Sequence, residues 1–254
     1  RADLVVYAVQ CNNMHLGILD YGVDLYQMVS RWHADTLYSS DPVVDPTKFV
    51  IVPNGVDLLR YRQQPVTERE PYRVMHSSSP DRGLHHLLDI WPQVRQRLPE
   101  ATLHIYYDMS VWFSVIDAVQ QQGSVTNTSG VAGLVRAGLK ATEGMGVVVH
   151  GGIGQWDLAR EQQKAALLVY PCTPVQPTEG FSVTVLEALA AGTPVITTDA
   201  DAFPELWADC TMQIPQPFEG KESLWVENIV GMLTSKRRWE RASAKGLRKA
   251  ETLQ

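Results

Sequence analysis

The chain has 254 residues, 44% of them hydrophobic and 20% charged, and a formal net charge of −6 at pH 7. These values are ordinary for a globular protein of one large domain or two small ones, and the negative charge argues against nucleic acid as a main partner. No apolar run approaches the about 20 residues of a membrane span. Three widely spaced cysteines without a CxxC motif indicate a reducing compartment and no structural metal, which predicts a cytoplasmic protein.

The first 56 residues predict a small and incomplete unit. Their apolar, β-branched segments predict three strands, Leu4–Val9, Val23–Val29 and Phe49–Val52, with a short helix at Trp32–Tyr38. No amphipathic helix is evident between the first two strands. Residues 1–56 are therefore interpreted as the remnant of a larger domain. Residues 57–70 are polar, charged and without periodicity, and we interpret them as a linker.

Residues 71–254 alternate regularly between two kinds of segment. Six segments predict strands: Arg73–His76, Thr102–Tyr107, Gly146–His150, Ala166–Tyr170, Val195–Thr198 and Met212–Ile214. Between them, apolar stripes predict helices at Leu84–Leu98, Asp157–Ala165 and Lys221–Leu233, with Pro92 as a kink in the first. Gly130–Glu143 is a further candidate helix, against which its glycines count. This order predicts an α/β fold with a doubly wound parallel sheet.

The most informative stretch is Glu179–Pro194, EGFSVTVLEALAAGTP. Its apolar residues recur at three- and four-residue steps, which predicts a helix that Gly192 and Pro194 end. Glu179 precedes this helix and Glu187 lies inside it, about 12 Å apart if the whole segment were helical. That gap could hold a pyrophosphate between a sugar and a ribose.

Backbone groups and loops supply the rest of the predicted site. The free N–H groups of Gly180, Phe181 and Ser182 would face phosphates at the helix N-terminus. In open α/β sheets, ligands bind beyond the carboxyl ends of the strands. The loops there are the richest in glycine, serine and charge, and they include Arg82 and Glu179.

This stretch resembles the donor-binding signature of retaining GT-B glycosyltransferases of glycosyltransferase family 4. Ten residues match it: Glu179, Phe181, Glu187, Ala188, Ala191, Gly192, Pro194, Val195, Pro204 and Glu205. The chain departs from the pattern at Ser182, where the family usually has glycine, and at Ala202 and Phe203, where it often has two. The resemblance covers about four-fifths of the chain and implies that residues 71–254 are a Rossmann-like, nucleotide-sugar donor-binding domain, with residues 1–56 left from the acceptor-side domain.

Two further loops carry the resemblance. The loop SSSPDRGL resembles the family's phosphate loop, with Arg82 and Gly83 matching and Ser77 where a second basic residue often stands. A guanidinium at this position can hold two phosphate oxygens at once. The loop HGGIG, containing His150, Gly152 and Ile153, resembles the strand end that meets the nucleotide base.

The resemblance implies transfer of a sugar from a nucleotide-diphosphate donor with retention of configuration and without a metal or other cofactor. By position, Glu179 would contact the transferred sugar, and Arg82 with the amides of Phe181–Val183 would offset charge on the leaving diphosphate. Glu187 would bind the ribose. The acceptor is an unspecified glycan, lipid or small molecule, and with most of the acceptor side missing we expect this chain to transfer sugar poorly.

Other interpretations remain open. The chain could be a non-catalytic nucleotide-sugar-binding subunit that needs a partner chain, or a sugar-nucleotide epimerase. At single residues, Glu187 could be solvated, Arg82 a surface residue, and HGGIG a simple tight turn with a structural His150. The basic helical stretch from Lys236 to Lys245 is either solvated or in weak contact with an anionic membrane surface.

Overall fold

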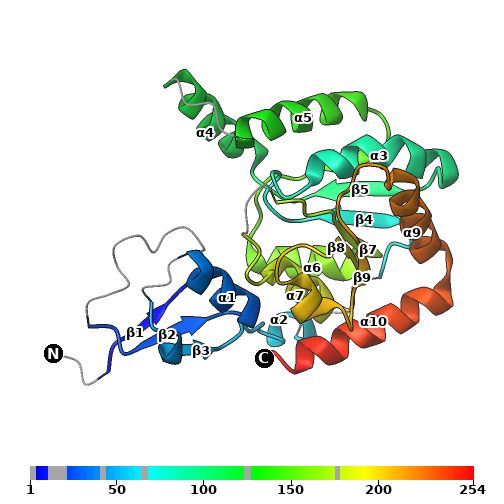
Figure 1. Cartoon of the computed structure of the whole chain (residues 1–254). Helices are drawn as coiled ribbons and strands as arrows, with labels where there is room; N and C mark the ends of the chain where they lie inside the picture. Colours follow the sequence, from blue (N-terminus) through cyan, green and yellow to red (C-terminus); the bar gives the residue numbers. More distant parts are fainter. Residues whose placement is uncertain (1–3, 11–21, 41–43, 64–67, 123–126, 175–177) are drawn as a thin grey trace.

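The computed structural model describes residues 4–10, 22–40, 44–63, 68–122, 127–174 and 178–254. They form two parallel sheets, one of three strands and one of six (Figure 1). The smaller sheet consists of β1 (Val6–Ala8), β2 (Leu25–Met28) and β3 (Phe49–Ile51), with α1 (Arg31–Ser40) and the 3₁₀ turn η1 (Pro46–Lys48) between the last two. The stretch between β1 and β2, where no helix is predicted, lies largely outside the described residues.

The larger sheet has the strand order β6-β5-β4-β7-β8-β9, with every neighbouring pair parallel. Its strands are β4 (Arg73–His76), β5 (Thr102–Ile105), β6 (Val147–Val149), β7 (Leu167–Tyr170), β8 (Val195–Thr198) and β9 (Met212–Ile214). The chain builds outward from β4 in one direction and then resumes at β7 in the other. The carboxyl ends of β4 and β7 thus flank the topological switch point, where ligands bind in open sheets.

Helices cover both faces of this sheet, as expected of a doubly wound fold (Figure 1). On one face α3 (Leu84–Arg97) packs against α5 (Asn127–Ala141) and α9 (Glu222–Thr234). On the other, α7 (Val183–Ala190) packs against α6 (Gln155–Lys164) and α10 (Lys236–Glu251). Each face has its own apolar cluster of buried side chains, which makes the sheet a two-sided core.

The predicted strands and helices of residues 71–254 are all present, with ends shifted by a few residues. Helix α3 continues through Pro92. Two helices were not predicted, α4 (Met109–Gln121) and the short α8 (Phe203–Trp207). The predicted linker contains a one-turn helix, α2 (Leu59–Arg62), which packs against α6, and residues 64–67 of it lie outside the described ranges.

Candidate functional site

The loop after β4 approaches the end of β7 so closely that only glycine fits at its tip. Gly83 has φ of +91°, and a Cβ atom there would lie 1.9 Å from the carbonyl oxygen of Pro171. Glycine adopts this backbone conformation without steric cost. Gly83 therefore lets the predicted phosphate loop rest directly against the switch point.

At this point Arg82 and Glu179 form an ion pair. Arg82 Nη1 donates a hydrogen bond to Glu179 Oε1 and another, of 2.7 Å, to Thr178 Oγ1. Glu179 is only 9% exposed, and burial raises the pKa of its carboxyl while Arg82 opposes that rise. The two residues whose predicted roles are at the reacting sugar and diphosphate are thus in direct contact and largely shielded from water.

Asp201 fixes the backbone that carries Glu179. The N–H groups of Thr178 and Glu179 both donate to Asp201 Oδ2, at 2.9 Å each. Asp201 has φ of +51°, the left-handed region that aspartate tolerates better than most residues. The sequence analysis did not single out this residue, although an Asp-Ala-Asp run directly after a strand end is a turn signal.

The amides expected to face phosphates stand just before α7. Ser182 caps the helix, its Oγ accepting a hydrogen bond from the N–H of Val185 at 3.4 Å. Within the described part of the chain, the N–H groups of Gly180, Phe181 and Ser182 have no hydrogen-bond partner. Gly180 packs against His33 of α1, where a Cβ atom would come within 3.1 Å of the ring. The loop thus lies between the helix start and the smaller sheet's helix.

Among the described residues, Glu187 contacts side chains of α2 and α6, and not of the loops at the switch point. It lies 3.7 Å from Arg60 Nη1 of α2, and Gln162 Nε2 of α6 donates to it at 3.4 Å. Gln162 in turn accepts a hydrogen bond of 2.9 Å from the Tyr61 hydroxyl. Burial raises the pKa of Glu187 as well. This carboxylate, predicted at the ribose, therefore connects α7 to the segment between the two sheets.

Ser77 stands where the resembling family often has a second basic residue, and it supplies no charge there. Ser77 Oγ is buried without a hydrogen-bond partner among the described residues, and so are both ring nitrogens of His76. Burial lowers the pKa of His76 to about 4, so its ring is neutral at pH 7. Arg82 is accordingly the cation that this loop contributes.

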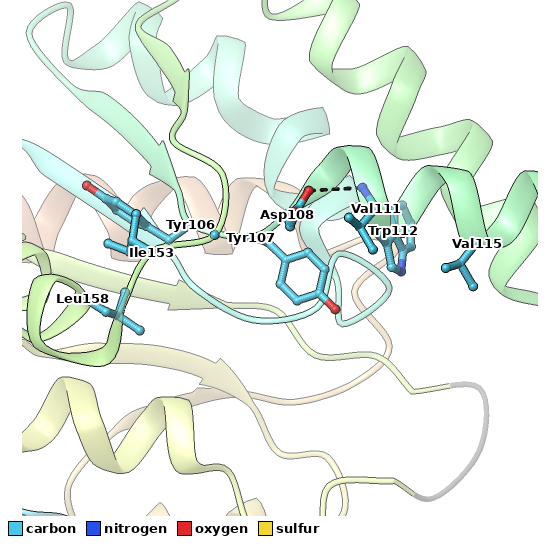
Figure 2. Close-up of a pocket in the computed structure, with 9 residues that line it drawn as sticks. Tyr106, Tyr107, Asp108, Val111, Trp112, Val115, Ile153 and Leu158 are labelled. Atoms are coloured by element: carbon cyan, nitrogen blue, oxygen red, sulfur yellow. Dashed lines mark hydrogen bonds between the residues drawn. The ribbon is translucent and has the colours of Figure 1, made fainter.

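A cavity of about 470 Å³ opens at the ends of β5 and β6 (Figure 2). Gly152 and Ile153, predicted at the nucleobase, line it together with aromatic and apolar side chains of the β5–α4 segment: Tyr106, Tyr107, Trp112, Val111 and Val115. Asp108 caps α4, its Oδ1 accepting from the N–H of Val111 at 3.1 Å. The sequence analysis missed this aromatic wall, because its contact with Gly152 depends on the pairing of β5 with β6.

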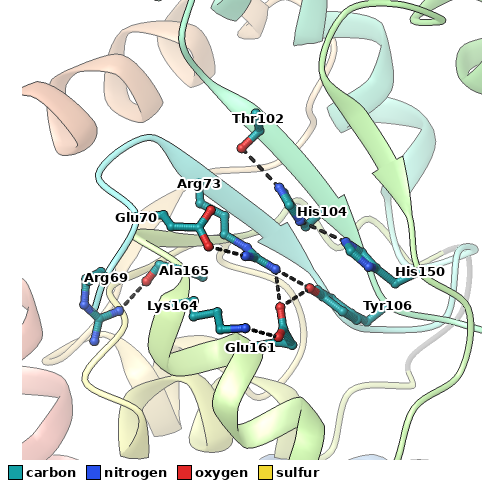
Figure 3. Close-up of polar contacts among 10 residues, drawn as sticks. All are labelled: Arg69, Glu70, Arg73, Thr102, His104, Tyr106, His150, Glu161, Lys164 and Ala165. Atoms are coloured by element: carbon teal, nitrogen blue, oxygen red, sulfur yellow. Dashed lines mark hydrogen bonds and ion pairs between the residues drawn. The ribbon is translucent and has the colours of Figure 1, made fainter. Parts of the chain in front are cut away.

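His150 stacks on Tyr106, which also lines this cavity (Figure 3). The two rings stack at 4.4 Å between centroids, and His150 Nε2 is 2.9 Å from His104 Nδ1. The Tyr106 hydroxyl donates to Glu161, which also pairs with Arg73. Burial, with Arg73 adding to it, lowers the pKa of His150. His150 is thus a neutral ring that supports the cavity wall through Tyr106.

The family follows from a match that covers most of the six-stranded unit. Residues 73–233 match the family model described as Glycosyl transferases group 1. The chain belongs to this family. Among curated relatives, the phosphatidyl-myo-inositol mannosyltransferase of Mycobacterium tuberculosis (strain CDC 1551 / Oshkosh) is 27% identical over 188 residues, covering 72% of this chain and 41% of the relative. The chain therefore spans less than half the length of this relative.

Solved structures of other glycosyltransferases share the fold of this group 1 chain. Anabaena HepE, solved with UDP and glucose, superposes with a TM-score of 0.73 at 15% identity, over 98% of this chain and 67% of HepE. WaaG, a glycosyltransferase involved in lipopolysaccharide biosynthesis, gives 0.66 at 18% identity, over 89% and 58%. These likenesses confirm the predicted GT-B, Rossmann-like fold class.

Two structural features are absent from the part of the chain that the structure describes. In those ranges no group of three or more His, Cys, Asp or Glu residues is placed to hold a metal ion. Nor is any helix there long and apolar enough to cross a membrane.

Glu205 of α8, which matched the signature without an assigned role, connects the six-stranded unit to α1 of the smaller unit. Its two carboxylate oxygens accept hydrogen bonds from the N–H groups of Arg31 (2.9 Å) and Trp32 (2.7 Å) at the start of α1. A carboxylate here also interacts favourably with the helix dipole. Glu205 thus caps a helix from the other sheet.

Glu205→Ala should loosen α1. Losing a capping side chain costs about 0.5–2 kcal/mol, and native-state hydrogen exchange of the α1 amides would measure this as a lower free energy of opening. Glu240→Ala, which removes an exposed carboxylate of α10, is the control. Unchanged α1 exchange in Glu205→Ala would contradict the capping role.

Proposed function

We propose that this chain is the donor-binding part of a retaining glycosyltransferase that uses a nucleotide-diphosphate sugar. The observation that carries the proposal is the Arg82–Glu179 pair at the switch point, next to unpaired amides at the start of α7. The pair brings a cation and a carboxylate together where leaving diphosphate and transferred sugar would meet. Such preorganised charges act most strongly where water is partly excluded.

The proposed roles follow from the chemistry of each group. Arg82 and the amides of Phe181–Val183 offset the charge that develops on the diphosphate, so no metal is required. Glu179 then accepts hydrogen bonds from hydroxyls of the sugar, with Asp201 holding its backbone. Glu187 binds the ribose hydroxyls, and Arg60 and Gln162 orient it.

The cavity beside Gly152 and Ile153 is the proposed nucleobase site. Its rings from Tyr107 and Trp112 offer flat apolar surface, and Asp108 offers a carboxylate oxygen for an N–H group of a base. Aromatic walls with one or two polar groups are typical of small-molecule sites. The UDP and glucose bound in the HepE structure support a nucleotide-sugar donor here.

The acceptor is proposed only by class. Similar proteins include a phosphatidyl-myo-inositol mannosyltransferase and WaaG, a glycosyltransferase involved in lipopolysaccharide biosynthesis, which favours a lipid or glycan acceptor over a free small molecule. A cytoplasmic location fits the buried, unpaired thiols of Cys172 and Cys210.

A nucleoside diphosphate should stabilise the chain without added divalent metal. At about 100 times its dissociation constant, UDP or GDP should raise the free energy of unfolding by about 2.7 kcal/mol in chemical denaturation, with chelator present. The bare nucleoside at equal concentration should give less. Stabilisation that requires Mg²⁺ or Mn²⁺ would contradict the metal-free site, and no stabilisation by any nucleotide would contradict donor binding.

A further inference from the structure

Helix α10 has one buried face and one exposed face. Its inner face packs tightly on α7, since a Cβ atom on Gly246 would come within 2.6 Å of a Leu189 methyl carbon. Ser243 Oγ also donates to the carbonyl oxygen of Gly192 at 2.6 Å. Figure 1 shows α10 along the outer edge of the six-stranded unit, on the opposite side from α3 and α5. The helix is therefore fixed in orientation, and its outer face points to solvent.

Four cations run along the outer face: Arg237, Arg241, Lys245 and Arg248. Their spacing of four, four and three residues places them in one stripe, about 16 Å long at 1.5 Å per residue. All four are exposed, and none makes a hydrogen bond or ion pair with another described residue. By contrast, Arg238 on the inner side donates to Asn228 Oδ1 at 2.6 Å. The stripe is thus positive charge without an ion-pair partner among the described residues, although Asp209 lines a shallow pocket beside Lys245 and Arg248.

This charge stands out against the rest of the chain. Seven of the 22 lysines and arginines fall within the 16 residues of α10, but only two of the 28 acidic residues do. The chain as a whole is negative, at −6. An acidic protein with one basic helix meets an anionic surface in one orientation, because the other faces are repelled.

We propose that α10 docks this chain on an anionic lipid surface. A straight row of flexible cations on a convex helix suits a flat layer of phosphate headgroups, which attracts clusters of four to eight basic residues. The contact is electrostatic and peripheral, and it does not depend on sugar transfer.

A nucleic acid is the competing anionic partner, but the outer face of α10 lacks the aromatic rings that would bind its bases. Single-stranded nucleic acids bind through aromatic stacking platforms in addition to charge. The ring of α10, Trp239, is half-buried, donates from Nε1 to the Ala166 carbonyl oxygen at 2.7 Å, and lies under the Arg69 guanidinium. The outer face of α10 therefore presents cations without exposed rings.

Vesicle co-sedimentation of the 254-residue chain tests the proposal. Binding to phosphatidylcholine vesicles with 30% phosphatidylglycerol should be measurable at low salt, absent with phosphatidylcholine alone, and lost as salt rises. The double variant Arg241→Gln/Lys245→Gln should bind about 25-fold more weakly, roughly fivefold per cation removed. Glutamine keeps much of the stem, so the fold should persist, which a thermal melt would verify.

The matched control removes two exposed, unpaired cations from other helices. Arg97→Gln/Lys140→Gln changes the net charge by the same amount at the ends of α3 and α5 and should retain wild-type vesicle binding within about threefold. Equal losses in both variants would mean that net charge alone governs binding, which overturns the proposal. It is also overturned by equal binding to neutral vesicles, or by poly-U RNA binding the chain more tightly than the anionic vesicles do.

Discussion

Arg82→Ala should weaken binding of a nucleoside diphosphate by about 1.5–3 kcal/mol, the usual range for hydrogen bonds to charged groups. Arg82 is the one cation that the predicted phosphate loop supplies, because Ser77 stands where a second could be, so we expect the upper part of this range. The binding free energy of the bare nucleoside should change little, because it has no phosphate for Arg82 to contact. Calorimetric titration of both ligands measures the difference, with Arg97→Ala, which removes an exposed arginine at the far end of α3, as the control.

The same variant should change stability in a pH-dependent way. Burial raises the folded-state pKa of Glu179 above its ordinary value, and Arg82 opposes this. An ionised, buried Glu179 costs stability above that raised pKa, and the cost disappears as the carboxyl is protonated at lower pH. Without Arg82 the folded-state pKa is raised further and the cost is larger, so the loss of unfolding free energy should grow as the pH rises above the ordinary pKa of a glutamate. A pH-independent loss, or equal weakening of both ligands, would place Arg82 away from this role.

The six-stranded fold was predictable because its strands are short runs rich in apolar residues, and β4, β7 and β8 are buried along their whole length. The bounds of β4, β8 and β9 are those read from the sequence. Helix α4 was not predicted because Met109–Gln121 is rich in β-branched and aromatic residues, which favour strand as much as helix. Helix α8 has five residues, too few to show a helical period.

The site was predictable in its parts but not in its pairings. Because loops at the carboxyl ends of parallel strands share one edge of the sheet, the sequence placed Arg82 and Glu179 at that edge. Their contact, however, joins residues 97 apart and depends on β4 lying next to β7. The link between Glu187 and Arg60 was missed for a similar reason, since residues 57–70 were interpreted as a linker without structure. Asp201 and Tyr106 likewise act through neighbours that only the strand order brings close.

Glu187→Gln and Glu179→Gln should weaken the binding of different ligands. With Glu187 at the ribose, Glu187→Gln should weaken nucleoside, nucleoside diphosphate and nucleotide sugar alike, by about 1–3 kcal/mol, because glutamine keeps one acceptor oxygen but loses the charge. With Glu179 at the sugar, Glu179→Gln should leave nucleoside-diphosphate affinity nearly unchanged and weaken the intact nucleotide sugar. Calorimetric titration of each variant with all three ligands gives the comparison.

The contacts of Glu187 define the control that this comparison needs. Glu187 pairs with Arg60 of α2, so its replacement could act by loosening α2 instead of by removing a ribose contact. Glu251→Gln breaks another ion pair of α2, the more exposed one between Arg62 and α10 at 3.3 Å, outside the proposed site. If Glu251→Gln leaves all three affinities unchanged while Glu187→Gln lowers them together, loosening of α2 does not explain the loss. If instead Glu179→Gln lowers the affinity for the bare nucleoside diphosphate as much as Glu187→Gln does, the sugar and ribose ends are wrongly assigned. Losses of binding free energy below about 0.5 kcal/mol in both variants would place neither carboxylate at the donor.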